Sequence, residues 1–346
     1  MKKYLFLISG LLLTGLLYSQ DNKWLIDKPG TWRFENYLPE KSYKLRNVTL
    51  SAADNTAFRT NIAALAEWFR QNHPMLKNPT GYDMRAIANR MWGDYTTISE
   101  AEYGLPATLA FLFEVFDSEG GKWTVEPPQY GLIVNNIIGG HQGFYFTPES
   151  LVEDGSRYDL SRSEDVRKAQ DMLWQYFPVS WFNESPCPGV DIYSANTGAT
   201  EQIVVYNPER PPYWLPVTLQ ELADASLAYY SLFQKVEMDR MILDQLKTEI
   251  AELSAEELAA PAYFGHDSHF VLKANGSGQG MQIMRFNPEY WNKSLPPSAI
   301  QFMAFWNPVQ SNEEMADHLQ RAGFPDYPQL FVNLIKWEEI ARLIIK

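Results

Sequence analysis

The amino-acid sequence predicts an α+β fold in which antiparallel hairpins are interleaved with amphipathic helices, as one large domain or two lobes. Three observations lead to this prediction. Strand-like and helix-like apolar periods alternate without a regular βαβ rhythm. Glycine turns at 117–121 and 275–276 lie between strand-like segments and predict hairpins. Capping-box motifs precede several helical stripes. For two lobes, we expect residues 20–155 and 156–346.

In the first half, apolar residues at helical spacing predict a helix that ends before His73-Pro74, because a residue that precedes proline is disfavoured in the α region. Residues 84–92 fit a helix or a strand equally well. Strands are expected at 106–116, 122–125 and 130–138.

In the second half, a helix is expected to begin at Ser161 and run to about residue 176. Residues 177–200 are rich in proline, serine, glycine and asparagine and are interpreted as a long connection, with an unrecognised strand as the alternative. Strands are expected at 201–206, 269–274, 280–286 and 299–306. Helices are expected from Thr218, over 236–253, after Ser254, from Ser311 and over 327–345.

A nine-residue segment occurs twice, as EQIVVYNPE at 201–209 and as MQIMRFNPE at 281–289. An aromatic pair follows each copy, and the prolines near the end of each copy restrict the backbone that leads to the pair. Three interpretations stay open: a common way to end a strand, an internal duplication, or two equivalent strand ends on one rim. The rim hypothesis places the rings in solvent, where they stack on a sugar or grip a peptide, and the competing hypothesis folds them into the core. The candidate ligand-binding residues are Arg210, Tyr213, Trp214, Tyr290 and Trp291.

Two weaker chemical candidates accompany this set. Glu221 and Asp224, three apart on a helix, could act as acid and base in glycoside cleavage, although acidic residues are also favoured near a helix start. His266 and His269 could bind a divalent metal with a third ligand, but on a strand they would point to opposite faces. No cofactor is expected.

Charge and the N-terminal residues bear on partners and compartment. The formal net charge of −13 argues against binding to nucleic acid. Lys2 and Lys3 before an apolar run predict a signal peptide at 1–19, and no membrane span is expected once it is removed. Cys187 is the only cysteine, so no intramolecular disulfide supports the fold. A periplasmic or secreted location is expected.

Together these features predict an exported protein that binds a sugar or peptide through an aromatic, proline-rich rim. The alternatives are a hydrolase, using the carboxylate pair or the histidine loop, and a structural envelope protein. No catalytic motif such as G-x-S-x-G decides between them.

Overall fold

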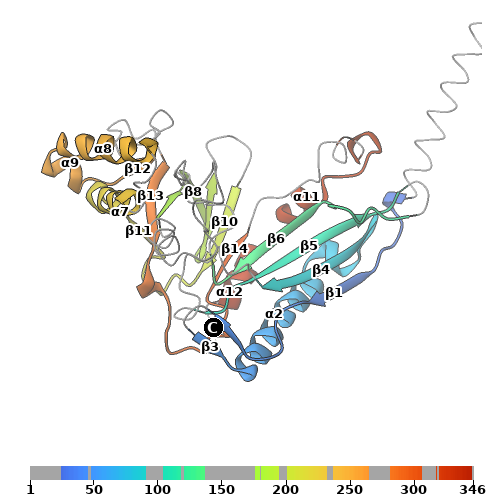
Figure 1. Cartoon of the computed structure of the whole chain (residues 1–346). Helices are drawn as coiled ribbons and strands as arrows, with labels where there is room; N and C mark the ends of the chain where they lie inside the picture. Colours follow the sequence, from blue (N-terminus) through green and yellow to red (C-terminus); the bar gives the residue numbers. More distant parts are fainter. Residues whose placement is uncertain are drawn as a thin grey trace, which may run out of the picture.

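An eight-stranded, mostly antiparallel sheet forms the centre of the protein (Figure 1). The computed structural model describes residues 25–45, 48–90, 104–117, 121–136, 176–179, 181–194, 201–231, 237–264, 281–305, 317 and 319–344. Only β1 and β4 are parallel neighbours in this sheet. Across the sheet the strands are β1 (Trp32–Asn36), β4 (Tyr82–Arg90), β5 (Ala107–Val115), β6 (Gln129–Val134), β14 (Phe302–Phe305), β10 (Glu201–Tyr206), β9 (Val190–Ser194) and β8 (Trp181–Cys187).

Side chains alternate between the two faces of the sheet. In β4, Met84, Ala86 and Ala88 are buried, whereas Asp83 and Arg85 on the opposite face are only half-buried. This period of two is typical of a strand packed on one side. Residues 84–90, which fit a helix or a strand by sequence, are therefore in a strand.

Helices cover one face of the sheet. The long helix α2 (Ala52–Asn72) begins at a capping box formed by Ser51 and Asp54 and ends at His73, as the following proline predicts. Figure 1 shows α2 running alongside β1 and β4. Its apolar stripe packs in the main core together with residues of α11 (Tyr327–Asn333) and α12 (Trp337–Ile344). The short helix α3 (Pro74–Lys77) follows α2 directly.

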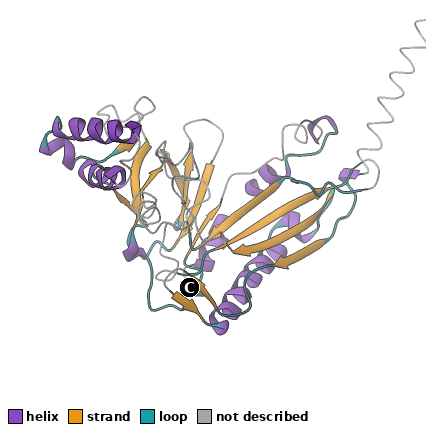
Figure 2. Cartoon of the chain, in the orientation of Figure 1, coloured by secondary structure: helices purple, strands orange, loops and turns teal. Residues whose placement is uncertain are grey.

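Among the described residues, a second, smaller sheet packs against the other face only where β9, β10 and β14 lie, over Tyr193, Val204, Phe302 and Ala304. In it, β13 (Met281–Phe286) pairs with β11 (Trp214–Pro216), β12 (Tyr263–Phe264) and β7 (Tyr176–Val179). Figure 2 shows the helices that follow β11 grouped at the end of the molecule away from α2. They are α7 (Leu219–Ser231), α8 (Glu237–Ala251) and α9 (Ala255–Ala259). The remaining elements are the hairpin of β2 (Tyr43–Leu45) and β3 (Val48–Leu50), and the 3-10 helix η2 (Pro288–Tyr290). These layers confirm the predicted α+β class.

Three predicted elements were wrong. Residues 122–125, expected to be a strand, form none, and Lys122 makes only an isolated bridge to Phe116. Residues 177–200, interpreted as a connection, contribute to β7, β8 and β9. The turn at Pro188-Gly189 joins β8 to β9, and Gly189 has φ +86°, where a Cβ would come within 2.7 Å of the Tyr206 carbonyl oxygen. Residues 327–344 form two helices, because α11 ends at Asn333 and α12 begins at Trp337.

Other expectations lie outside the described residues: the signal peptide, the helix from Ser161 up to residue 175, the strand at 269–274 with its turn at 275–276, and the start of a helix at Ser311. The division at residue 155 stays a prediction; β6 and β14, from either side of it, are hydrogen-bonded neighbours. Within the described ranges, no helix combines the length and the apolar character that crossing a bilayer requires.

Candidate functional site

The candidate site is built on the turn that ends β10. The main-chain amide of Arg210 donates to the Asn207 carbonyl oxygen at 3.2 Å, which closes a tight turn with Pro208 at its second position. The Asn207 side-chain oxygen accepts from the main-chain amide of Glu209 at 2.9 Å. Asparagine in this role stabilises a turn from within. The backbone that carries Glu209 and Arg210 is therefore fixed by local hydrogen bonds.

The second copy of the repeated segment forms the same turn after β13. The Tyr290 amide donates to the Asn287 carbonyl oxygen at 3.1 Å, and the Glu289 amide donates to the Asn287 side-chain oxygen at 3.0 Å. Tyr290 thus occupies the position of Arg210 in the first turn. The two strands belong to different sheets, but their turns have the same hydrogen-bond pattern.

The two turns are bonded to each other. The Asn207 amide donates to the Tyr290 hydroxyl at 2.9 Å, and the Arg210 Nε donates to the Tyr290 carbonyl oxygen at 3.2 Å. In the reverse direction, the Asn287 amide donates to the carbonyl oxygen of Tyr213, which follows the first turn, at 2.7 Å. Of the three interpretations of the repeat, this contact supports two equivalent strand ends at one place.

A cavity of about 290 Å³ opens beside these turns. This volume lies at the lower end of small-ligand pockets and suits a molecule the size of a monosaccharide or a dipeptide. Residues from both turns, from the segment after η2 and from the end of α12 line the cavity: Asn207, Glu209, Arg210, Tyr290, Asn292, Leu295, Gln301 and Ile344.

Opposite charges line the cavity without forming an ion pair. Among the described residues, the Glu209 carboxylate and the terminal nitrogens of the Arg210 guanidinium have no hydrogen-bond or ion-pair partner. Arg210 is half-buried and Glu209 is exposed. Both groups are therefore available to a ligand.

The neighbouring polar groups differ in whether they are available. The Tyr290 hydroxyl accepts from Asn207 and donates to the Gln301 carbonyl oxygen at 2.7 Å, so it acts as part of the wall. The Gln301 side chain is bonded to the backbone of Asn292. By contrast, the side-chain amino groups of Asn207 and Asn292 have no partner within the described ranges. With Arg210, they make the cavity rich in hydrogen-bond donors.

The prediction that four rings lie in solvent was wrong. Tyr213, Trp214, Tyr290 and Trp291 are 4%, 7%, 1% and 3% exposed, and they form a second core with Phe286, Phe302 and other residues of both sheets. Proline restricts the backbone but does not decide where the next ring packs. Burying an aromatic side chain removes on the order of 150–250 Å² from water and is strongly favourable. Of the candidate ligand-binding residues, only Arg210 and Tyr290 line the cavity.

The weaker candidates do not converge with this cavity. The Glu221 carboxylate forms an ion pair with the Arg285 guanidinium at 3.0 Å, and the Asp224 carboxylate accepts from the Gln220 side chain at 2.8 Å. Neither carboxylate lines the cavity. His266 and His269 lie outside the described residues. Within the described ranges, no group of three histidine, cysteine or acidic side chains is arranged to hold a metal ion.

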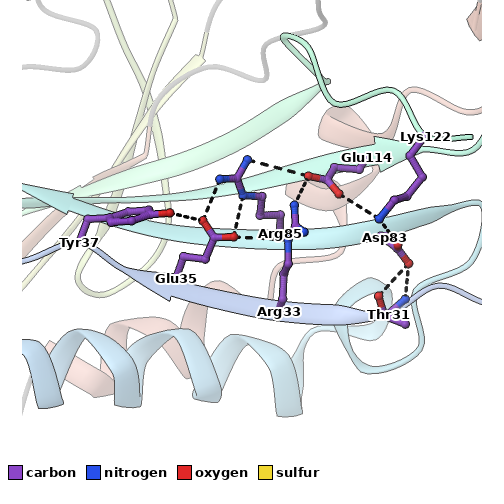
Figure 3. A network of polar contacts seen from close by, with 8 residues as sticks. All are labelled: Thr31, Arg33, Glu35, Tyr37, Asp83, Arg85, Glu114 and Lys122. Carbon is purple, nitrogen blue, oxygen red and sulfur yellow. Dashed lines mark hydrogen bonds and ion pairs between the residues drawn. The ribbon is translucent and has the colours of Figure 1, made fainter.

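A network of charged side chains lies on the outer face of β1, β4 and β5 (Figure 3). It places Arg33 beside Arg85 and Asp83 beside Glu114 in register, which alone would be repulsive. Ion pairs across these rows compensate the charges: Arg33 to Glu114 at 2.5 Å, Arg85 to Glu35 at 2.8 Å and Lys122 to Asp83 at 2.7 Å. Three acids and three bases pair internally, so this network is better suited to stabilising the sheet than to binding a ligand.

Searches with this chain found no match among descriptions of protein families, among curated proteins or among solved structures. The candidate site therefore rests on its own geometry.

Sequence reasoning missed most of the cavity. The signal for Asn207 and Glu209 was present, because both belong to the repeated segment. Leu295 and Gln301 lie between η2 and β14, whereas Ile344 lies at the end of α12. None of them carries a local motif, so only the fold shows that they meet.

Proposed function

We propose that this protein binds a small polar ligand, of the sugar or peptide class, in the cavity between the two Asn-Pro-Glu turns. The observation that carries the proposal is that Glu209 and Arg210 line the cavity without an ion-pair partner among the described residues. Leaving charges without a partner is unfavourable unless water or a ligand compensates them. The apolar side chains of Leu295 and Ile344 supply contact surface beside the polar groups.

The rigidity of the wall also supports binding. Local hydrogen bonds hold both turns, and Tyr290 ties them together. A site whose backbone is already ordered loses little conformational entropy when a ligand binds.

A ligand panel tests the proposal. Neutral monosaccharides, amino acids and dipeptides would be titrated into the purified protein while the thermal midpoint is recorded, because a ligand that binds the folded state raises this midpoint. We expect at least one class to raise it in the native protein and not in Arg210→Ala. Arg321→Ala is the matched control, since Arg321 is an exposed arginine with a 3.1 Å ion pair to Asp317.

Two results would contradict the proposal. One is a panel in which no compound changes the midpoint. The other is a ligand whose effect is equally large in Arg210→Ala and in the native protein.

A further inference from the structure

We infer that the ligand is a zwitterion, a free amino acid or a short peptide with both ends unblocked, whose carboxylate contacts Arg210 and whose ammonium group contacts Glu209. This inference rests on the proposed function and selects one ligand chemistry for the same cavity. A neutral sugar would use the amide donors but would leave both charges without a counterion.

The donors in the cavity fit a carboxylate. Arg210 offers the terminal nitrogens of a planar guanidinium, which match the two oxygens of a carboxylate. Its Nε is occupied by the Tyr290 carbonyl oxygen at 3.2 Å, which holds the guanidinium in place while leaving the terminal nitrogens available. The side-chain amino groups of Asn207 and Asn292 add neutral donors nearby.

The position of Glu209 fits an ammonium group. Among the described residues that line the cavity, Glu209 is the only acidic one, and it is adjacent in sequence to the only basic one, Arg210. In an amino acid, too, the two opposite charges are a short distance apart. A ligand that carries both charges would neutralise both side chains at once, and charge-assisted hydrogen bonds are among the strongest in proteins.

The two copies of the turn share their backbone structure but differ in the side chains that they present to the cavity. In the second turn, Tyr290 replaces the arginine, and the Asn287 side-chain amino group donates to the Pro212 carbonyl oxygen at 2.6 Å. Glu289 is exposed and does not line the cavity. Both turns have the same backbone hydrogen bonds, but only the first presents a guanidinium, a carboxylate and an unbonded amide to the cavity. The turn itself therefore does not require the Arg210 guanidinium, because Tyr290 stands in the same position of the second turn.

The experiment compares three probes by calorimetric titration: alanyl-alanine, its N-acetylated form and its C-terminal amide. They are titrated into the native protein and into Arg210→Gln, Glu209→Gln and the matched control Glu289→Gln. Glu289 has the same place in its turn as Glu209, so the control shares the charge change and any effect on turn stability.

We expect alanyl-alanine to bind the native protein more tightly than either blocked form. Arg210→Gln should weaken its binding roughly ten- to hundredfold, the usual range for losing a hydrogen bond to a charged group. Glu209→Gln should weaken alanyl-alanine but leave the affinity of the N-acetylated form unchanged, because that form has no ammonium group. Glu289→Gln should change neither affinity.

The inference is overturned if the blocked forms bind as tightly as alanyl-alanine, or if Glu209→Gln and Glu289→Gln have equal effects. If a neutral sugar binds in an Arg210-dependent way and the zwitterion does not, the inference fails and the proposed function stands. If no probe and no sugar binds, both fail.

Discussion

Asn207 and Tyr290, 83 residues apart in the chain, are joined by a hydrogen bond of 2.9 Å from the Asn207 main-chain amide to the Tyr290 hydroxyl. The same hydroxyl donates to the Gln301 carbonyl oxygen at 2.7 Å. One buried oxygen thus connects the turn after β10, the turn after β13 and the segment before β14. These three segments form the wall of the cavity.

Replacing Tyr290 with phenylalanine should therefore destabilise the fold. The change leaves the Asn207 amide without its acceptor and the Gln301 carbonyl oxygen without its donor, and each such loss costs about 1–3 kcal/mol. We expect a loss of about 2–4 kcal/mol in the free energy of unfolding, measured by urea denaturation. Tyr263→Phe is the control, because the Tyr263 hydroxyl has no partner among the described residues. Equal stability of the two variants would refute the linking role of Tyr290.

A second link between the sheets runs through Asp191. This buried carboxylate on β9 accepts from the Tyr213 hydroxyl at 2.7 Å, from Ser185 Oγ at 2.5 Å and from the Tyr206 hydroxyl at 3.3 Å. Asp191→Ala removes the acceptor from these donors, so the free energy of unfolding should fall by about 2–4 kcal/mol. The exposed Asp244→Ala should change it by less than about 0.5 kcal/mol. An effect at Asp191 as small as that at Asp244 would contradict a linking role for this carboxylate.

Glu114 is the buried centre of the charged network, with a side chain only 1% exposed. Arg33, Arg85 and Lys122 surround it at 2.5 Å, 4.0 Å and 3.5 Å. Glu114→Ala leaves three cations near one another, and breaking a buried ion pair on one side typically costs about 3–5 kcal/mol. Because Arg33 and Lys122 are partly solvated, we expect about 2–3 kcal/mol in a urea melt. Restoring stability by the double change Glu114→Ala, Arg33→Ala would confirm that the cost is electrostatic.

The network also implies a dependence on acid. Hydrogen bonds from Arg85 and Tyr37 lower the pKa of Glu35 below its usual 4.5, although burial opposes them. A carboxyl group with a lowered pKa stabilises the fold above the pKa of the unfolded chain, and this contribution is lost as the pH falls through the folded pKa.

His73 should also make the fold less stable in acid. Its effect begins at a higher pH than the protonation of the carboxylates. The His73 Nε2 lies 3.0 Å from the Phe331 carbonyl oxygen, which can only accept, so Nε2 carries the proton. The buried Nδ1 has no hydrogen-bond partner in the part of the chain that the structure describes. Burial lowers the pKa of His73 from 6.5 to about 4, with the Phe331 hydrogen bond opposing it. Between these values the unfolded chain binds a proton that the folded chain does not. Stability therefore falls as the pH drops from 6.5 towards 4.

We expect this histidine to contribute a decrease of about 2 kcal/mol in the free energy of unfolding between pH 7.5 and 5. His73→Phe keeps a ring that can stack on Phe331, where the two ring centroids lie 4.0 Å apart. In urea melts at both pH values, the variant should lose about 2 kcal/mol less than the native protein. Identical pH dependence in the two proteins would contradict the buried, neutral state of His73.

Local patterns in the sequence predicted helices and strands better than they predicted which residues contact each other. The α2 helix, the β10 strand and the caps at Thr218 and Ser254 follow from signals within a few residues, and the structure contains each of them. The β8–β9 hairpin was missed although Pro188-Gly189 is a turn signal, because the proline-rich composition around it suggested a loop.

Local sequence patterns could not predict whether the aromatic rings are buried or exposed. Proline fixes the backbone angle before Tyr213, but the position of the ring depends on Tyr193, Phe302 and other residues far away in the chain. The repeated segment lies beside the cavity for a different reason. Its turns bring Arg210 and Glu209 to a cavity, whereas the aromatic rings that follow build the wall and the core behind it.

The most direct test of the central claim is to follow the Arg210 side chain by NMR during a titration with alanyl-alanine. We predict that its Nε–Hε signal shifts progressively and saturates with the ligand, while the signal of Arg321 stays unchanged. Binding of alanyl-alanine without any change at Arg210 would contradict the account.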